Sequence, residues 1–234
     1  MQLGHLYGIG VGPGDVELLT LKAFRILKEV PVIFAPKPDD KQESFAYNIV
    51  RELIDIRRQE VINLIFPMIK DETKLRVYWQ DAAATIWQQL AQGKDCAFIT
   101  EGDPLFYGTF SYIHHIFQQR YPQVNIEVIP GISSVNAAAA RAQTPLAQGD
   151  DYVAILASTP DDERLKQILH NFDTIVLMKV HSIPRVITIL EQLDLVDNFT
   201  YVQRCTTPAE EIIRDARKLR ENKSDYLSLL MIRK

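Results

Sequence analysis

The chain has 234 residues, 47% of them hydrophobic, and a formal net charge of −4 at pH 7. This length suits one large domain or two small ones, each able to bury its own core. The charge balance contains no basic run and argues against a nucleic-acid-binding protein. No segment approaches the ~18 consecutive apolar residues of a membrane helix, and the N-terminus lacks the features of a secretion signal. We therefore expect a cytoplasmic protein that contacts no membrane.

The two cysteines, Cys96 and Cys205, follow no metal-ligand spacing. We expect them to be buried thiols in a reducing compartment, without a disulfide. The sequence predicts no metal site.

The first half of the chain alternates short apolar runs with longer segments of helical spacing. The apolar runs predict strands at 6–11, 32–35, 61–66, 96–100 and 126–129. Helices are expected at 17–29, 44–53, 75–90 and 106–120, and a further helix ends at Arg141. This alternation is typical of a mostly parallel sheet covered by helices on both faces.

A turn-rich stretch at 144–151 separates this part from a second, smaller α/β part. Strands are expected there at 152–157, 174–178, 200–204 and 226–233, with helices at 161–171, 182–193 and 209–221. We predict an α/β fold of two domains, residues 1–143 and residues 144–234, the second with a mixed sheet.

The first strand runs into a loop with four glycines, Gly8, Gly10, Gly12 and Gly14. The dinucleotide fingerprint G-x-G-x-x-G fails in both registers, because Pro13 or Asp15 occupies the position of the third glycine. The phosphate-binding pattern that ends in Gly-Lys-Ser or Gly-Lys-Thr is absent as well. Two interpretations stay open: a tight turn in which Asp15 caps the next helix, and a loop that faces a ligand.

Two further strand ends carry similar residues. The segment AFITEGDPLFYGTFSY at 97–112 suggests that Asp103 caps a helix with Pro104 in its first position, which leaves Glu101, Gly102 and the aromatic pair at 106–107 unexplained. VIPGISS at 128–134 opens a helix through Ser133 or Ser134. Glycine, proline and small hydroxyl residues at three strand ends allow backbone groups to approach a bound molecule closely.

Taken in order, IGVGPGD, ITEGDPLFYGTF, VIPGISS followed by AAAA, and VLMK at 176–179 resemble the tetrapyrrole (corrin and porphyrin) methylase family. The resemblance spans nearly the whole chain. GVGPGD-x-E-L-L-T-L-K-A at 10–23, FPM at 66–68 and GDPLFYGTF are similar to the members that methylate C(20) of precorrin-2. This implies a methyltransferase of cobalamin biosynthesis that uses S-adenosylmethionine, releases S-adenosylhomocysteine and acts on precorrin-2 or cobalt-precorrin-2.

The family likeness further implies a homodimer and a cofactor held in the cleft between two domains. Carried over by motif, the cofactor-binding residues are Pro13, Glu101, Gly102, Asp103, Phe106, Ser133, Ser134, Met178 and Cys205, the last in place of a family glycine. The substrate carries many carboxylates, so basic residues should bind it. Candidate substrate-binding residues are Gly12, Gly14, Asp15, Lys37, Arg141 and Lys179, with Arg204 as a further basic candidate; each basic residue is equally well explained as a surface charge.

The expected chemistry is an in-line methyl transfer, which depends on alignment of the reacting atoms. The reduced tetrapyrrole supplies its own nucleophilic carbon, so no activated Ser, Cys or Lys is required, and the five histidines are scattered. The acceptor of the departing proton stays open, with Asp103 and Tyr107 as candidates. Alternatives are methylation of another ring position, a non-catalytic tetrapyrrole-binding protein, and a nucleotide-binding or dehydrogenase module.

Overall fold

A computed structural model describes residues 2–234, and the chain divides into two compact units, Met1–Ser133 and Ser134–Lys234. These are called unit 1 and unit 2. The boundary between the units falls after Ser133 in the sequence, whereas we predicted a domain boundary after residue 143. The difference is the helix α5 (Ser134–Ala142), which belongs to unit 2 because it contacts a strand of that unit.

Unit 1 is built on a five-stranded parallel sheet. Its strands are β1 (Leu6–Gly10), β2 (Val32–Lys37), β3 (Glu60–Ile65), β4 (Cys96–Thr100) and β5 (Ile126–Ile129), in the order β3-β2-β4-β1-β5. Every neighbouring pair is parallel, which confirms the predicted sheet. Because all strands run the same way, their carboxyl ends meet at one edge of the sheet.

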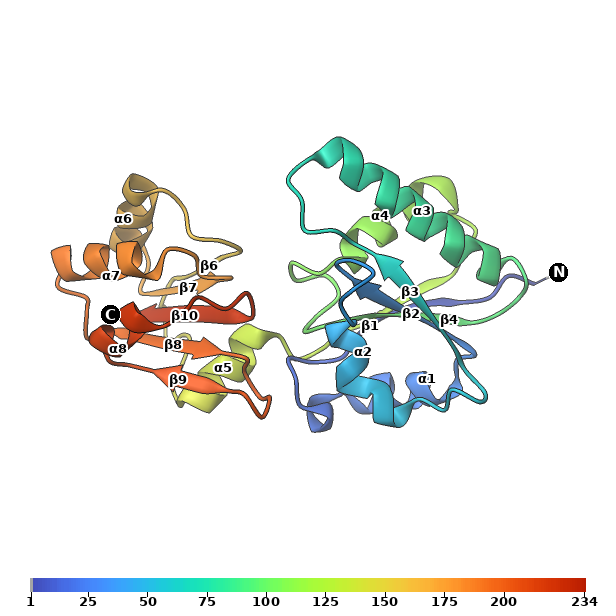
Figure 1. Cartoon of the computed structure of the whole chain (residues 1–234), viewed down its shortest axis with the longest axis horizontal. Coiled ribbons are helices and arrows are strands. Elements are labelled where there is room, and N and C mark those ends of the chain that lie inside the picture. Colours follow the sequence, from blue (N-terminus) through green and yellow to red (C-terminus); the bar gives the residue numbers. More distant parts are fainter. Residues whose placement is uncertain (1) are drawn as a thin grey trace. The chain divides into compact units, whose positions relative to one another are not determined.

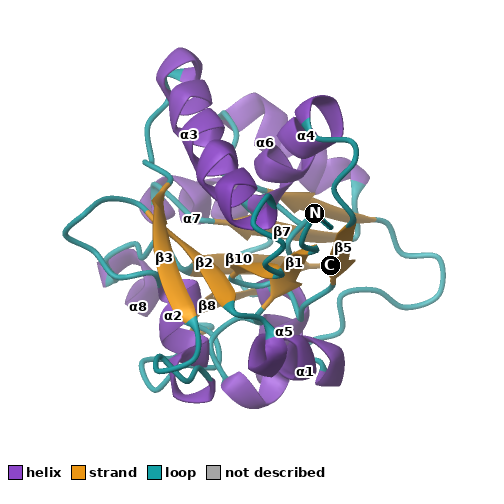
Figure 2. Cartoon of the chain, turned by 90° about the vertical axis from the view of Figure 1, so that its right-hand side faces the viewer, coloured by secondary structure: helices purple, strands orange, loops and turns teal. Residues whose placement is uncertain are grey.

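Helices cover both faces of this sheet, as predicted. Figures 1 and 2 show α3 (Glu72–Leu90) and α4 (Phe110–Arg120) on one face, and α1 (Leu21–Glu29) and α2 (Phe45–Val50) on the other. Alternate residues of β4 enter two separate cores: Cys96 and Phe98 pack with α3 and α4, whereas Ala97 and Ile99 pack with α1 and α2. A central strand that is buried on both faces explains its uninterrupted apolar sequence.

Two helices of unit 1 begin later than the sequence predicted. The expected helix at 17–29 is split into a 3₁₀ turn, η1 (Val16–Leu18), and α1, because the Thr20 hydroxyl accepts a hydrogen bond from Ala23 N and starts a new helix. The expected helix at 106–120 begins at Phe110. Gly102 and Tyr107 adopt left-handed backbone angles, with φ of 65° and 54°, so the segment before Phe110 remains a loop. The prediction that Asp103 and Pro104 start this helix is therefore wrong.

Unit 2 contains a mixed sheet, as expected, with five strands where the sequence predicted four. Its strands are β6 (Val153–Leu156), β7 (Thr174–Met178), β8 (Phe199–Gln203), β9 (Glu211–Ile213) and β10 (Ser228–Arg233), in the order β6-β7-β10-β8-β9. Only the pair of β6 and β7 is parallel. β10 runs between β7 and β8 in the opposite direction, so it starts at the edge where those two strands end.

The helices of unit 2 are α5, α6 (Asp162–Asn171), α7 (Ile183–Gln192), a helix with a proline in its first turn, and α8 (Ala216–Glu221). The last three share one core with Leu177, Tyr201 and Leu230 of the sheet. The predicted helix at 209–221 is wrong in its first half, where β9 pairs with β8. The β-branched pair Ile212–Ile213 favours a strand, and α8 starts only after Asp215, whose carboxylate accepts from Arg217 N.

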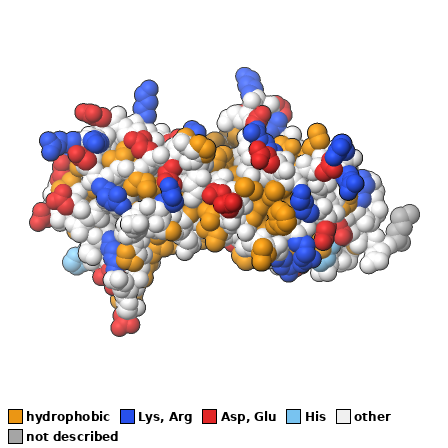
Figure 3. Space-filling view, turned by 90° about the horizontal axis from the view of Figure 1, so that it is seen from below, with side chains coloured by type: hydrophobic (Ala, Val, Ile, Leu, Met, Phe, Trp, Pro, Cys, Tyr) orange, Lys and Arg blue, Asp and Glu red, His pale blue; other side chains and the backbone are white. Residues whose placement is uncertain are grey.

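Hydrophobic side chains gather on the side of unit 1 that α1 and α2 cover (Figure 3). Exposed large apolar residues of η1 and α1 include Val16, Leu21 and Phe24. Across residues 2–234, no helix combines the length and apolar character that crossing a bilayer requires.

An ion pair in unit 2 ties α5 to the loop between β8 and β9. Arg141 Nε donates to both carboxylate oxygens of Glu210, at 2.8 and 3.0 Å, and Thr206 N donates to the same carboxylate at 2.7 Å. Charge-assisted hydrogen bonds of this kind are stronger than neutral ones. The contact gives Arg141 a structural partner that does not involve a ligand.

The Arg141–Glu210 pair should make stability depend on pH. The hydrogen bond from Arg141 is the largest of the effects that lower the pKa of Glu210 below its ordinary 4.5. A carboxylate with a lowered pKa stabilises the fold above its unfolded-state pKa, and this contribution is lost as the pH falls through the folded-state value. We expect Glu210→Gln to lower the free energy of unfolding by about 2 kcal/mol at neutral pH. The loss should be smaller at about pH 3.5, below the ordinary pKa of 4.5, where part of this contribution is already gone.

Urea unfolding followed by circular dichroism at both pH values measures this difference. The control is Glu163→Gln, because Glu163 forms only an exposed ion pair with Lys166 at 3.8 Å and should change stability little. An equal loss for Glu210→Gln at both pH values would show that the charge of Glu210 contributes nothing.

Candidate functional site

Three loops meet at the carboxyl edge of the unit 1 sheet. The loop after β1 and the loop after β4 are joined by backbone hydrogen bonds: Val11 N donates to Thr100 O at 2.9 Å, and Gly102 N donates to Gly12 O at 2.8 Å. Gly12 N returns a bond to Gly102 O at 3.3 Å, so the two glycines form an isolated antiparallel bridge. The sheet is thereby extended beyond its strands by one pairing between loops.

The loop after β5 packs against this bridge through glycine backbone. A Cβ atom on Gly10 would lie 2.5 Å from Gly102 O and 2.6 Å from Gly131 N, and one on Gly131 would overlap Gly102 O. Any side chain at either position would force the three loops apart. We call Gly10, Gly12, Gly102 and Gly131 the glycine junction.

Asp103 connects the second and third loops. One carboxylate oxygen accepts from Leu105 N at 2.9 Å and the other accepts from Gly131 N at 3.1 Å. Both oxygens thus hold backbone in place, which gives Asp103 a structural role where the sequence suggested a helix cap. Its backbone and that of Gly102 lie at the junction, in the segment expected to contact the cofactor.

The other predicted cofactor- and substrate-binding residues of the three loops lie within a few positions of the junction glycines in the sequence. Pro13 and Gly14 lie in the first loop, and Asp15 caps η1 by accepting from Glu17 N at 2.9 Å, as in one of the two interpretations that the sequence left open. Glu101 lies between β4 and Gly102, and Phe106 contacts the Tyr107 ring with centroids 5.0 Å apart. Ser133 is the last residue of unit 1.

One polar atom beside the junction is conspicuous. Thr100, the last residue of β4, is buried, and its hydroxyl has no hydrogen-bond partner within residues 2–234. Buried polar groups nearly always have a partner, so this hydroxyl marks a place for a polar group of a ligand or for water. The loop that covers it contains Gly108, where a Cβ would come within 3.0 Å of the Thr100 methyl group.

Apolar side chains are exposed in three loops at the same edge. They are Met68 and Ile69 after β3, Leu105 and Tyr107 after β4, and Ile132 after β5. In the sequence, the FPM segment at 66–68 carried only a family likeness and Tyr107 was only a candidate proton acceptor, so the set as a whole was missed. The available signal was the repeated placement of large apolar residues directly after predicted strands. We call these five residues the apolar rim.

Lys37, a predicted substrate-binding residue, ends β2 at this edge. Its side chain is only 14% exposed, and its ammonium lies 3.6 Å from the Asp40 carboxylate. It is therefore already paired.

Unit 2 carries the remaining predicted residues. Met178 ends β7, Lys179 follows it, and Cys205 lies two residues after β8, all at the edge where β10 begins. Burial raises the pKa of the Cys205 thiol to about 12, so it stays protonated at neutral pH and is no nucleophile. Ser134 is the first residue of α5. The predicted cofactor-binding set thus falls into two groups, one on each unit.

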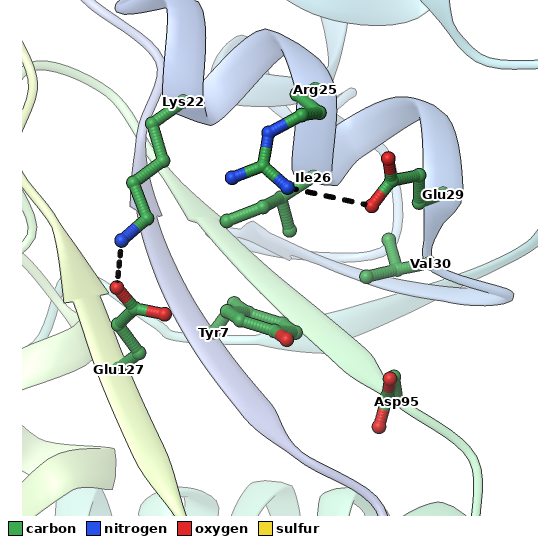
Figure 4. A pocket seen from close by; sticks show the side chains of 8 residues that line it. All are labelled: Tyr7, Lys22, Arg25, Ile26, Glu29, Val30, Asp95 and Glu127. Carbon is green, nitrogen blue, oxygen red and sulfur yellow. Dashed lines mark hydrogen bonds and ion pairs between the residues drawn. The ribbon is translucent and has the colours of Figure 1, made fainter.

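The opposite edge of the unit 1 sheet holds a pocket of about 200 Å³ (Figure 4). Tyr7 lies within it, and four of its charged lining residues pair with each other: Lys22 with Glu127, and Arg25 with Glu29 at 3.9 Å. The fifth, Asp95, accepts a hydrogen bond from His5 N at 2.7 Å. It shares no residue with the predicted site. Within residues 2–234, no group of three or more His, Cys, Asp or Glu side chains could hold a metal ion.

The glycine junction predicts a large penalty for Gly131→Ala. The added methyl group would overlap Gly102 O, and overpacking against backbone should lower the free energy of unfolding by about 3 kcal/mol or more. Gly149→Ala is the matched control, since φ there is +55° but no atom lies within 4 Å of the added carbon. It should cost only about 1 kcal/mol from the left-handed backbone. Thermal unfolding compares the two variants, and similar losses would show that the three loops do not depend on this close contact.

Comparisons with known proteins agree with the family likeness. The model of the family "Tetrapyrrole (Corrin/Porphyrin) Methylases" matches residues 5–219. The chain is 37% identical to a probable cobalt-precorrin-2 C(20)-methyltransferase of Methanocaldococcus jannaschii, over 98% of this chain and 96% of that one. It is 31% identical to a precorrin-2 C(20)-methyltransferase of a Sinorhizobium species, over 98% of this chain and 95% of that one.

The fold is also similar to solved structures. A uroporphyrin-III C-methyltransferase from Thermus thermophilus, solved in complex with S-adenosylhomocysteine, has a TM-score of 0.68 and 21% identity, and the match covers 98% of this chain and 92% of that one. At this identity the likeness concerns the fold. With the family model matched over most of its length, the chain belongs to the tetrapyrrole (corrin/porphyrin) methylase family.

Proposed function

We propose that this protein transfers a methyl group from S-adenosylmethionine to C(20) of precorrin-2 or cobalt-precorrin-2, in cobalamin biosynthesis. The observation that carries the proposal is the 37% identity to a probable cobalt-precorrin-2 C(20)-methyltransferase over 98% of this chain. A relative named for the cobalt-free substrate is nearly as similar, at 31%. Both substrates therefore belong in the test.

The residues at the carboxyl edge of unit 1 fit a nucleoside-containing cofactor. The glycine junction leaves no side chains between three loops, and the Thr100 hydroxyl beside it is buried without a partner in residues 2–234. Residues that would hold the cofactor in unit 1 are Pro13, Glu101, Gly102, Asp103, Phe106 and Ser133. Ser134, Met178 and Cys205 would contribute from unit 2. When bound, S-adenosylmethionine supplies a methyl group on a positively charged sulfur.

The apolar rim supports a large, flat substrate. Five exposed apolar side chains follow β3, β4 and β5, where a soluble surface would ordinarily be polar. A tetrapyrrole has a broad apolar ring face and a charged periphery. Contact of the ring face with the rim would exclude water from the reacting carbon, and the rim would fix the distance of the ring from the junction.

The protein's own part in the reaction is positioning. The substrate carbon is the nucleophile, and correct alignment alone contributes about 7–11 kcal/mol in favourable model reactions. Asp103 is used to hold the Gly131 backbone, so its contribution is to the shape of the site. Tyr107 remains the better candidate for relaying the proton that leaves the methylated carbon, because its phenol can accept this proton while it donates its own to water. It is 51% exposed in the loop after β4. Gly12, Gly14 and Asp15 are proposed to face the substrate from the first loop.

The decisive measurement is an anaerobic incubation of the purified protein with S-adenosylmethionine and either precorrin-2 or cobalt-precorrin-2. We expect the product to gain one methyl group, located at C(20) by NMR with a ¹³C-labelled methyl donor. The substrate with the higher kcat/KM is the natural one. A control without the tetrapyrrole should yield no S-adenosylhomocysteine.

Other results would assign other functions. A methyl group at a different carbon would place the protein among methylases of another ring position. Tight binding of the tetrapyrrole without any methylation would indicate a non-catalytic binding protein.

We further propose that the protein is a cytoplasmic homodimer. Its two cysteines are both free and buried, which fits a reducing compartment. The dimer surface is proposed to be the side of α1 on which Leu21 is 89% and Phe24 is 42% exposed. Exposed apolar patches on a folded surface mark protein contacts when they are contiguous.

The double variant Leu21→Glu, Phe24→Glu should be monomeric, because two carboxylates would be desolvated in the interface. Light scattering coupled to size-exclusion chromatography measures the mass. Val77→Glu on α3, at an exposed apolar position on the opposite face of the sheet, is the control and should leave the dimer intact. A dimeric double variant would place the interface elsewhere.

A further inference from the structure

Two basic residues occupy equivalent positions in unit 2. Lys179 directly follows β7, and Arg204 directly follows β8. The start of β10 lies between them: Lys179 N donates to Ser228 O, and Arg204 N donates to Leu227 O, each at 2.8 Å. With one strand between them, their Cα atoms are about 10 Å apart, which is two strand spacings. We call Lys179 and Arg204 the basic pair.

Both residues have strained backbones. Their φ angles are 49° and 46°, in the left-handed region that residues with a Cβ rarely occupy. Ser182 and Thr206, three and two residues further along, are left-handed as well. Strained backbone persists where the surrounding structure enforces it, and it concentrates at sites that bind ligands. Four such residues in the loops after β7 and β8 therefore call for a functional reason.

The basic pair converges on one short segment from two sides. Arg204 Nε donates to the Asp225 carboxylate at 2.7 Å, and the Lys179 ammonium lies 5.0 Å from the centre of the Tyr226 ring. Asp225 and Tyr226 lie three and two residues before Ser228, the first residue of β10. The segment thus fixes where the two cationic groups lie.

The side chains of Lys179 and Arg204 both have hydrogen-bond donors with which they can bind an anion. Within residues 2–234, Lys179 forms no ion pair, and an aromatic ring leaves the three N–H donors of its ammonium without a carboxylate. Arg204 uses Nε for Asp225, and its two terminal nitrogens make no hydrogen bond to the described part of the chain. Those nitrogens can grip a second carboxylate in the paired geometry that guanidinium favours.

We propose that the basic pair binds two carboxylate side chains of the tetrapyrrole and so restricts the orientation in which the ring binds. The inference rests on the proposed function, since it takes its ligand from the proposed substrate. A ring that carries acidic chains around its edge presents several carboxylates, so each of the two cationic groups can bind a different one. Holding two of them at once restricts the ring orientation, and with it the choice of carbon for methylation.

The test compares the kinetics of the unaltered protein with those of Lys179→Gln, Arg204→Gln and the double variant. Each single change should raise KM for the tetrapyrrole about tenfold, and the double change about a hundredfold. The kcat value should stay within about threefold, and the affinity for S-adenosylhomocysteine should not change. Lys166→Gln, which removes an exposed lysine of α6 in the same unit, is the matched control and should leave KM unchanged.

A glycine variant separates binding from folding. Because glycine adopts positive φ without strain, Lys179→Gly should keep or raise the thermal midpoint while it raises KM as Lys179→Gln does. A fall in thermal midpoint together with an unchanged KM would overturn the inference and make the pair structural.

Three other outcomes also decide the matter. An unchanged KM in the double variant would overturn the inference while the unaltered protein's turnover sustains the proposed function. Loss of S-adenosylhomocysteine binding would overturn it too, because the pair would then hold the cofactor. No turnover by the unaltered protein with either substrate would overturn both the proposed function and this inference.

Discussion

The close contact of glycine backbones at the carboxyl edge of the unit 1 sheet is the constraint on which the site depends. Gly10, Gly102 and Gly131 come from the ends of three different strands, and a single Cβ at Gly10 or Gly131 would separate them. Parallel strands bring these ends to one edge, but pairing within the sheet stops at Gly10 and Thr100. Beyond these residues, the bridge between Gly12 and Gly102 joins the first two loops, and the carboxylate of Asp103 joins the second loop to the third. The loops are therefore a rigid extension of the sheet.

Rigid loops suit a reaction that needs alignment more than acid or base strength. Methyl transfer to a substrate carbon requires neither a thiolate nor an activated hydroxyl, and burial keeps both Cys96 and Cys205 protonated by raising their pKa to about 12. What the chain must supply is a fixed geometry for two ligands. Strained residues serve the same end: Tyr107, Lys179 and Arg204 each direct a long side chain from a left-handed backbone.

The sequence predicted the buried parts of the fold well and the loops poorly. β4 has the predicted bounds because a strand buried on both faces must be apolar throughout. Asp103 and Pro104 suggested a helix start, yet Asp103 instead accepts from Leu105 N and from Gly131 N, a residue 28 positions away. A contact at that separation leaves no local pattern. β9 was missed for a related reason, since it is a strand only because β8 pairs with it.

The site residues show the same limit. Sequence motifs identified the three loops. They could not separate two basic candidates, Arg141 and Lys179, which differ in their partners: Arg141 forms an ion pair with Glu210, and Lys179 lies over the ring of Tyr226. Lys37 is likewise paired, with Asp40. No pattern in the sequence distinguishes a basic side chain that is ion-paired within the fold from one that can still bind an anionic ligand.

That distinction matters because the protein as a whole repels its proposed substrate. The chain has a formal net charge of −4, and a substrate with many carboxylates gains nothing from the long-range field of an acidic protein. Attraction must come from individual cations in direct contact with the substrate, because salt screens charges that lie further away. Arg141 and Lys37 are neutralised by a neighbouring acid, and Arg204 shares its charge with Asp225 through Nε alone. A cation beside an aromatic ring, such as Lys179, has no acid to neutralise it and can still bind a carboxylate of the ligand. Substrate binding therefore depends on which partner each basic residue has in the fold, more than on the number of basic residues.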